Sequence, residues 1–246
     1  WSARLAPLFA DFAQVRDGDS VLDVGCGTGS LVQTVADRTH RSQIVGIDPA
    51  QAFIEYCRKR FADPRIEFAC GSALELPYPD GYFGQSLSLL VLMFIPQPEK
   101  AASEMRRVTR PGGTVAACTW DRTGMQLNAI FWEEAVRLDP MAEKKAGRPQ
   151  HCNRQGHLAE LWHAAGLTDI EETVLEIRAD FNSFDDYWSP YTHGAGPQGA
   201  YIGGLSRERR DRLRESLRQR LLGGEPPGPF SLGAKALAVR GIVPLG

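Results

Sequence analysis

The sequence predicts an α/β protein with a doubly wound, mostly parallel sheet that carries helices on both faces. Short apolar runs with the length and β-branching of buried strands alternate with segments of helical period. A glycine-rich turn follows the first run, and an acidic residue ends the second. At 246 residues with 43% hydrophobic content, the chain can bury a substantial core.

The first half alternates regularly between the two kinds of segment. We expect strands over 21–24, 44–47, 66–69, 85–92 and 114–119, and helices over 1–13, 30–37, 49–61 and 98–108. Pro49 suits the first turn of its helix, on which Phe53, Ile54 and Cys57 are expected to face inward. The Pro111-Gly112-Gly113 run is expected to end the helix over 98–108.

The second half is less regular. We expect helices over 128–138 and 157–165, a loop over 141–155, and strands over 168–179 and 236–243. Between these two strands lies a segment, 180–235, that is rich in aromatic residues, then in glycine, and then forms a charged helix over 206–222. An insertion of this kind at a sheet edge is typical of a cap over a substrate pocket.

The glycine turn after the first strand predicts a ligand site. Gly25, Gly27 and Gly29 leave the backbone accessible at the start of a helix, where free N–H groups suit an anionic ligand. The order is G-x-G-x-G, because Ser30 stands where a dinucleotide site places its last glycine. Asp48, at the end of the second strand, could bind both hydroxyls of a ribose, or could cap the following helix.

At these residues the chain resembles the class I S-adenosylmethionine-dependent methyltransferases, in the group of the ubiquinone and menaquinone biosynthesis C-methyltransferases (type 11). The resemblance extends from about residue 15 to residue 120 and includes 21–29, 46–49, 71–80, Phe83, 104–108 and 110–113. It implies a single domain over 1–246 with a seven-stranded sheet and an antiparallel last strand. Residues 1–120 would be the cofactor-binding half, 121–179 and 236–246 the remainder of the sheet, and 180–235 a helical substrate cap.

The resemblance also implies a cofactor, S-adenosyl-L-methionine, and a set of residues that bind it. Ser72 departs from the family, which usually has Asp there to accept from the adenine amino group, and Gly84 departs from a structural Asp. For Asp23 and for the side chains of Leu89 and Leu90, a purely structural role is the alternative. The expected cofactor-binding residues are Asp23, Gly25, Cys26, Gly27, Thr28, Gly29, Asp48, Pro49, Ser72, Ala73, Leu89 and Leu90.

The expected reaction is methyl transfer to a small-molecule substrate that is apolar or aromatic. Its candidate binding residues are Tyr187, Trp188, Tyr191 and His193 of the insertion, and His193 is the one candidate general base. No dedicated base is required if the acceptor is already nucleophilic, so the catalytic residues are otherwise unknown. The five scattered cysteines have no metal-ligand spacing, and we expect no metal.

Composition argues against several other classes. A net charge of −2 and the absence of an Asn-Pro-Pro-Tyr motif disfavour a nucleic-acid partner. No run has the length of an integral membrane segment, no signal peptide is visible, and an odd number of free thiols suits a cytoplasmic protein. The arginine-rich helix over 206–222 is either a solvated face or a surface for an acidic partner. The oligomeric state is not specified by the sequence.

Two other functions are compatible with the same turn. One is a cofactor-binding protein of this fold that transfers no methyl group, which the loss of the adenine carboxylate at Ser72 would favour. The other is a nicotinamide-dependent oxidoreductase, against which Ser30 argues.

Overall fold

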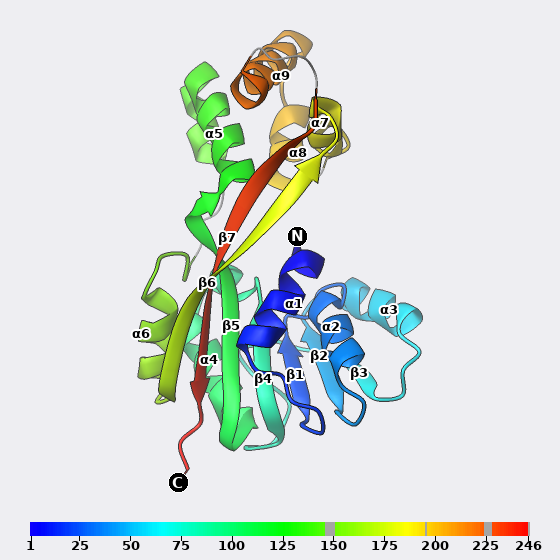
Figure 1. Ribbon diagram of the computed structural model, residues 1–246, viewed down its shortest axis with the longest axis vertical. Helices are drawn as coiled ribbons and strands as arrows, with labels where there is room; N and C mark the ends of the chain where they lie inside the picture. The colour runs from blue at the N-terminus through cyan, green and yellow to red at the C-terminus, as the bar shows by residue number, and fades with distance from the viewer. Residues whose placement is uncertain (146–150, 195, 224–227, 246) are drawn as a thin grey trace. The chain divides into compact units, whose positions relative to one another are not determined.

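The computed structural model describes residues 1–145, 151–194, 196–223 and 228–245 (Figure 1). The chain forms two compact units. The first contains Trp1–Arg122, His151–Leu175 and Lys235–Gly246, and the second contains Thr123–Gln150 and Glu176–Ala234. The second unit therefore includes the predicted helix over 128–138 as well as most of the 180–235 segment, of which residues 195 and 224–227 lie outside the described part of the chain.

The sheet confirms the predicted fold class. Its strand order is β3-β2-β1-β4-β5-β7-β6, with parallel pairing from β3 through β5, and β7 runs against its neighbours (Figure 1). The central strand β1 is buried over its whole length, because it pairs with a strand on each side and is covered on both faces. The strands are β1 Val21–Val24, β2 Ile44–Asp48, β3 Ile66–Cys70, β4 Phe83–Leu89, β5 Thr109–Met125, β6 Thr168–Phe181 and β7 Phe230–Ile242.

Helices cover both faces of the sheet in the first unit. Helices α1 (Ser2–Phe12), α2 (Ser30–Arg38) and α3 (Gln51–Arg60) lie on one face, and α4 (Pro98–Val108) and α6 (His157–Ala164) lie on the other (Figure 1). Each begins and ends within two residues of its predicted position. The face under α4 and α6 holds a large apolar core, in which the buried Trp162 indole donates to the Val115 carbonyl at 2.9 Å.

Several predicted boundaries were wrong. The fifth strand was expected over 114–119, but β5 extends over Thr109–Met125, and the last strand was expected to begin at residue 236, but β7 begins at Phe230. The fourth strand ends at Leu89, because Leu90 adopts a left-handed conformation (φ +63°) and the chain continues into a short 3-10 turn, η1 (Leu92–Phe94). The Pro111-Gly112-Gly113 run does not end α4. The helix stops at Val108, and the run forms an irregularity inside β5, between the residues that pair with Phe83 and Gln85 of β4.

The structure shows what occupies the space beside Gly84, where the resemblance implies a structural Asp. A Cβ at Gly84 would lie 2.7 Å from an oxygen of Asp19. The Asp19 carboxylate in turn accepts a hydrogen bond at 2.8 Å from Arg110. A carboxylate from a neighbouring loop therefore fills this position, and a side chain on Gly84 would displace it.

The second unit is built around aromatic side chains. Its helices are α5 (Gln126–Leu138), α7 (Phe184–Thr192), α8 (Gly196–Gly203) and α9 (Arg207–Leu222), with a 3-10 turn, η2, over Pro140–Lys145; residues 146–150 of the predicted loop lie outside the described part. The rings of Tyr187 and Tyr191 pack at 5.4 Å and those of Phe131 and Tyr191 also at 5.4 Å. These contacts give the segment a hydrophobic core of its own.

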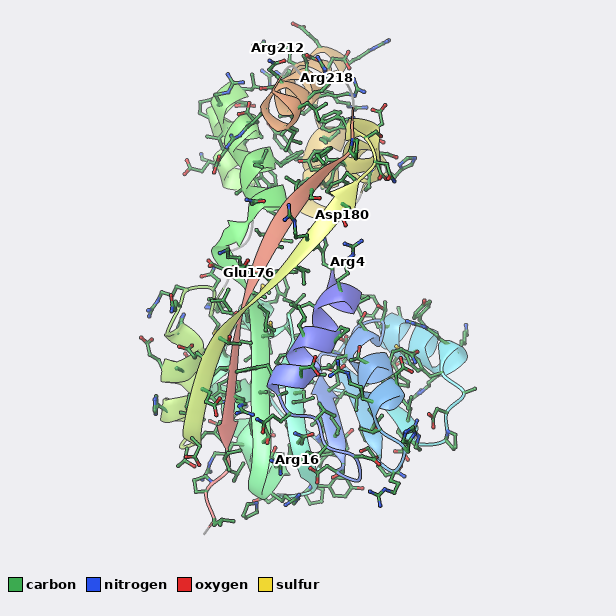
Figure 2. The ribbon with its side chains drawn as sticks, viewed as in Figure 1. Arg4, Arg16, Glu176, Asp180, Arg212 and Arg218 are labelled. Carbon is green, nitrogen blue, oxygen red and sulfur yellow. The ribbon has the colours of Figure 1, made fainter. Side chains whose placement is uncertain are left out.

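The arginines of α9 mostly serve ion pairs inside this unit. Arg220 pairs with Glu133 and Glu134 of α5, and Arg214 pairs with Asp185 of α7. Arg212 and Arg218 come from the same helix (Figure 2), and Arg218 pairs with Glu215 one turn earlier. These ion pairs leave less of the charge of the helix available to an acidic partner.

Candidate functional site

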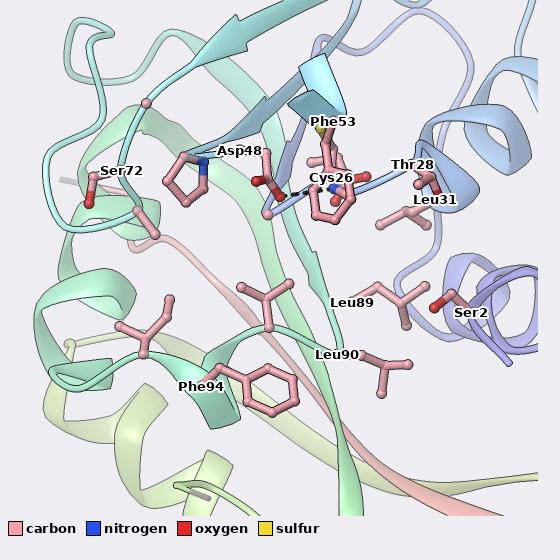
Figure 3. A pocket seen from close by; sticks show the side chains of 18 of the residues that line it. Ser2, Cys26, Thr28, Leu31, Asp48, Phe53, Ser72, Leu89, Leu90 and Phe94 are labelled. Carbon is pink, nitrogen blue, oxygen red and sulfur yellow. Dashed lines mark hydrogen bonds between the residues drawn. The ribbon is translucent and has the colours of Figure 1, made fainter. Parts of the chain in front are cut away.

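A cavity of about 500 Å³ lies in the first unit, where the carboxyl ends of β1, β2, β3 and β4 meet (Figure 3). A parallel sheet places ligands at this edge. Of the twelve predicted cofactor-binding residues, eleven line the cavity and Gly29 does not. The sequence analysis did not assign the other lining residues to the site: Ser2, Ser30, Leu31, Phe53, Gly71, Leu74, Val91, Phe94, Ile95 and Pro96.

The three glycines of the turn have different reasons to be glycine. All three have positive φ, between +52° and +84°. A Cβ on Gly25 would lie 2.5 Å from the Val91 side chain, and one on Gly29 would lie 2.7 Å from the Phe61 ring. A Cβ on Gly27 would meet nothing within 4 Å, since Gly27 faces the cavity. Tight packing therefore explains why residues 25 and 29 are glycine. At Gly27 the explanation is that a side chain would obstruct the access of a ligand to the backbone.

Asp48 holds the turn in place. One of its oxygens accepts from the Gly27 N–H at 3.0 Å (Figure 3), and the other accepts from the Ala50 N–H at 2.9 Å, just before α3. The capping alternative was wrong, because the N-cap of α3 is Ala50 and no side chain caps this helix; the bond to the Ala50 N–H forms a turn that leads into α3. A carboxylate offers about four acceptor positions, so Asp48 keeps capacity for further donors in the cavity.

Asp23 is the unusual group of the site. Its side chain is only 2% exposed, and neither oxygen has a hydrogen-bond partner. Burial, and secondly the negative charge of Asp48, raise the pKa of Asp23 to about 8, and the backbone N–H of Val32 lowers it by less than these two raise it. A buried carboxyl with two unsatisfied oxygens is costly, and such a group marks a place where a ligand can supply donors.

The polar groups of the loop after β3 form hydrogen bonds within the loop. The Ser72 hydroxyl accepts from the Leu74 N–H at 3.1 Å, and the Ser72 carbonyl accepts from the Glu75 N–H at 3.2 Å. Ser72 and Ala73 line the cavity, and no carboxylate of this loop is among the lining residues that the structure describes. Ligand recognition at this end would rest on a hydroxyl, backbone and apolar contacts.

The opposite wall is apolar. It runs from Leu89 to Pro96 through the left-handed residue Leu90, whose N–H donates to the Cys118 carbonyl at 2.7 Å. The Phe94 side chain lines the cavity and is 61% exposed. Ile54 and Cys57 are buried, as predicted. The prediction was wrong for Phe53, which lines the cavity and is 44% exposed. The available sequence signal for both Phe53 and Phe94 was an aromatic residue within a few positions of the carboxyl end of a predicted strand.

The predicted substrate residues lie in the second unit. Tyr187, Trp188 and Tyr191 are buried in its aromatic core, and none of them lines the cavity described above. His193 is exposed at the end of α7, where its Nδ1 lies 2.8 Å from the carbonyl of Ser189. These four residues remain proposals, with a packing role now evident for the three aromatic ones.

The Cys26 thiol, the other reactive group of the site, is not ionised near neutral pH. Burial raises the pKa of the Cys26 thiol far above its usual range, so the thiolate nucleophile is not formed near neutral pH. Within residues 1–145, 151–194, 196–223 and 228–245, no three metal-ligating side chains cluster. In the same ranges no helix combines the length and apolar character that crossing a bilayer requires.

Comparison with known proteins gives a consistent assignment. A methyltransferase-domain family model matches residues 22–117. Demethylmenaquinone methyltransferase of Paenarthrobacter aurescens is 30% identical over 175 residues, which cover 66% of this chain and 68% of that protein. A 24-methylenesterol C-methyltransferase of Arabidopsis thaliana is 31% identical over 117 residues, 46% of this chain and 32% of that one.

The solved structure of a geranyl diphosphate methyltransferase in complex with S-adenosylmethionine superposes with a TM-score of 0.57 at 16% identity, over 98% of this chain and 85% of that chain. It shows a common fold. The chain spans between 30% and 68% of the length of the first curated relatives that it matches. Taken with the glycine turn and the cavity, these matches establish that the chain belongs to the class I S-adenosylmethionine-dependent methyltransferases.

Proposed function

We propose that this chain transfers a methyl group from S-adenosylmethionine to a small, uncharged, apolar or aromatic acceptor. The observation that carries the proposal is the cavity itself, which joins a glycine turn and two carboxylates to an apolar wall. Relatives that act on a demethylmenaquinone and on a sterol support a lipophilic acceptor.

The residues present fit the cofactor. Gly27 leaves its backbone open to the cavity, and Asp48 keeps acceptor capacity for the ribose hydroxyls. Asp23 has two buried oxygens without donors, which suits a cationic group. The expected binding set therefore stands as our proposal for eleven residues, and we assign Gly29 to packing against Phe61.

When bound, the cofactor supplies a methyl group activated by a sulfonium sulfur. The chain's own contribution is to orient and to exclude water. Leu89, Leu90 and Phe94 present apolar surface to the reacting region, and an acceptor held there needs no separate base if it is already nucleophilic. The small number of polar groups on this wall accounts for the absence of an evident catalytic constellation.

The charge of the lining argues for an uncharged acceptor. Among the lining residues that the structure describes, the carboxylates of Asp23 and Asp48 have no Lys, Arg or His beside them. An acidic acceptor would be repelled by Asp48 and would find no basic side chain to pair with among these lining residues.

Binding and transfer can be tested separately. Isothermal titration calorimetry should show that S-adenosylhomocysteine binds to the protein and that NAD does not. Incubation with methyl-labelled cofactor should then transfer label to at least one member of a panel of quinone precursors, phenols, sterols and amines. A carboxylated analogue of that acceptor should receive less label than the neutral compound. Binding of S-adenosylhomocysteine without transfer of the methyl label to any acceptor would favour the alternative, a cofactor-binding protein. Binding of NAD in its place would overturn the assignment.

A further inference from the structure

Two carboxylates lie in the same cavity and are treated differently by their surroundings. Asp48 is 8% exposed, and each of its oxygens holds a backbone N–H. Asp23 is 2% exposed, and neither of its oxygens has a donor. The protein thus gives each oxygen of Asp48 a backbone donor. For Asp23 the backbone N–H of Val32, at the start of α2, lowers the pKa, but burial and the charge of Asp48 are the larger effects and raise it.

The groups around Asp23 add no positive charge. The titratable side chains that interact with it are Asp48 at the end of β2, Cys26 in the glycine turn and Cys57 on α3. Burial raises the pKa of both thiols, so they stay neutral, and Asp48 repels a second negative charge. Without a ligand, burying the Asp23 carboxyl costs least free energy when the carboxyl is protonated and therefore neutral.

We infer that Asp23 carries a proton in the free protein and loses it when a cationic ligand enters the cavity, so that cofactor binding is coupled to proton release. The balance is simple. The protonated carboxyl of Asp23 meets an ammonium group, the carboxylate and the ammonium form a pair, and the proton leaves to the solvent. This inference depends on the proposed function, since it takes the ligand to be S-adenosylmethionine or its product.

The coupling makes affinity depend on pH in a defined direction. Because the free carboxyl has its pKa raised to about 8 and the paired carboxylate has a lower one, binding releases a proton at any pH between the two values. Affinity should tighten with rising pH below pH 8, toward a limit of about tenfold per pH unit, and should level off above it.

The experiment is calorimetric titration of the full chain with S-adenosylhomocysteine at pH 7, in buffers that differ in ionisation enthalpy. The dependence of the observed heat on the buffer should report about one proton released. Methylthioadenosine, which has the nucleoside and thioether but lacks the amino-acid ammonium, should release none. Asp23→Asn should bind S-adenosylhomocysteine without proton release, and Asp37→Asn, an exposed carboxylate on α2, should behave as wild type.

A second readout does not depend on the variants. With ¹³C-labelled aspartate, the free protein should show one carboxyl resonance that titrates near pH 8, and this resonance should move to the carboxylate position on adding S-adenosylhomocysteine. If S-adenosylhomocysteine binds with no buffer-dependent heat, or if methylthioadenosine releases as many protons, the inference is overturned and the proposed function stands. If S-adenosylhomocysteine does not bind to the wild type, the proposed function itself fails.

Discussion

Gly29 lies against the ring of Phe61, so closely that a methyl group on Gly29 would stand 2.7 Å from a ring carbon. Two residues earlier, Gly27 faces open space in the cavity. One short turn therefore serves two functions, because Gly29 lets α2 approach the end of α3 while Gly27 leaves a surface for the ligand.

Alanine at these two positions should separate the two functions. Gly29→Ala adds overpacking to left-handed strain and should destabilise the protein by about 3 kcal/mol. Gly27→Ala carries the strain alone, about 1 kcal/mol, but its methyl group enters the cavity and should weaken S-adenosylhomocysteine binding at least tenfold. Thermal unfolding and calorimetry measure the two effects. A Gly27→Ala protein that binds like wild type would contradict the placement of the ligand.

Asp48→Asn should lower both stability and affinity. The asparagine side chain has a single oxygen, so it can no longer accept from both the Gly27 and the Ala50 N–H groups. Loss of one buried, charge-assisted hydrogen bond should cost about 2 kcal/mol of unfolding free energy. Chemical denaturation at pH 7 gives the stability, and calorimetry with S-adenosylhomocysteine gives the affinity. Asp37→Asn serves as the control, and an unchanged affinity in Asp48→Asn would argue against its role in holding the turn.

Stability without ligand should fall as pH rises, through Asp23. Below about pH 4 its carboxyl is protonated in both the folded and the unfolded chain, and it makes no pH-dependent contribution. Between about pH 4 and pH 8 the unfolded chain has lost this proton while the folded protein keeps it, so the free energy of unfolding decreases with pH. Comparing thermal unfolding of wild type and Asp23→Asn from pH 5 to pH 9 isolates the effect. A constant difference between the two proteins across that range would show that Asp23 does not titrate there.

The loop carboxylate beside Gly84 should be exchangeable with one placed on Gly84 itself. Gly84→Asp alone puts a side chain within 2.7 Å of Asp19 and a second negative charge beside it, and should destabilise the protein by about 2 kcal/mol. Adding Asp19→Ser removes the clash and leaves one carboxylate near Arg110, so the double variant should recover most of the loss. Additive losses in this double-mutant cycle would refute the compensation.

Phe94 should affect the acceptor more than the cofactor. Its ring lines the apolar wall and is 61% exposed, so it has surface to bury when an apolar acceptor binds. With an acceptor found in the labelling screen, Phe94→Ala should raise KM for that acceptor about tenfold. Calorimetry should show unchanged binding of S-adenosylhomocysteine.

The matched control is Tyr82→Ala. Tyr82 is 58% exposed but precedes β4, at the opposite end of the strand from the cavity. Equal effects of the two variants on KM would remove Phe94 from the acceptor site.

The local sequence pattern predicted the structure well where adjacent residues encode it. The apolar run over 21–24 and the glycines after it predicted both the central strand and the turn, because strand length and left-handed backbone are encoded by adjacent residues. It misjudged the end of β4, where the left-handed Leu90 interrupts a run of apolar residues that is otherwise well suited to a strand.

The chain sequence by itself determined the alternation of strands and helices in the first half, the glycine turn and the acidic residue that ends the second strand, because these depend on period, spacing and residue type. Only the tertiary structure decided that Gly29 meets Phe61, that Asp19 occupies the space beside Gly84, and that Asp23 is left without a donor. It also placed Tyr187 and Tyr191 in an aromatic core. The reason is that burial and hydrogen-bond satisfaction depend on residues far apart in the chain, which a linear pattern does not bring together.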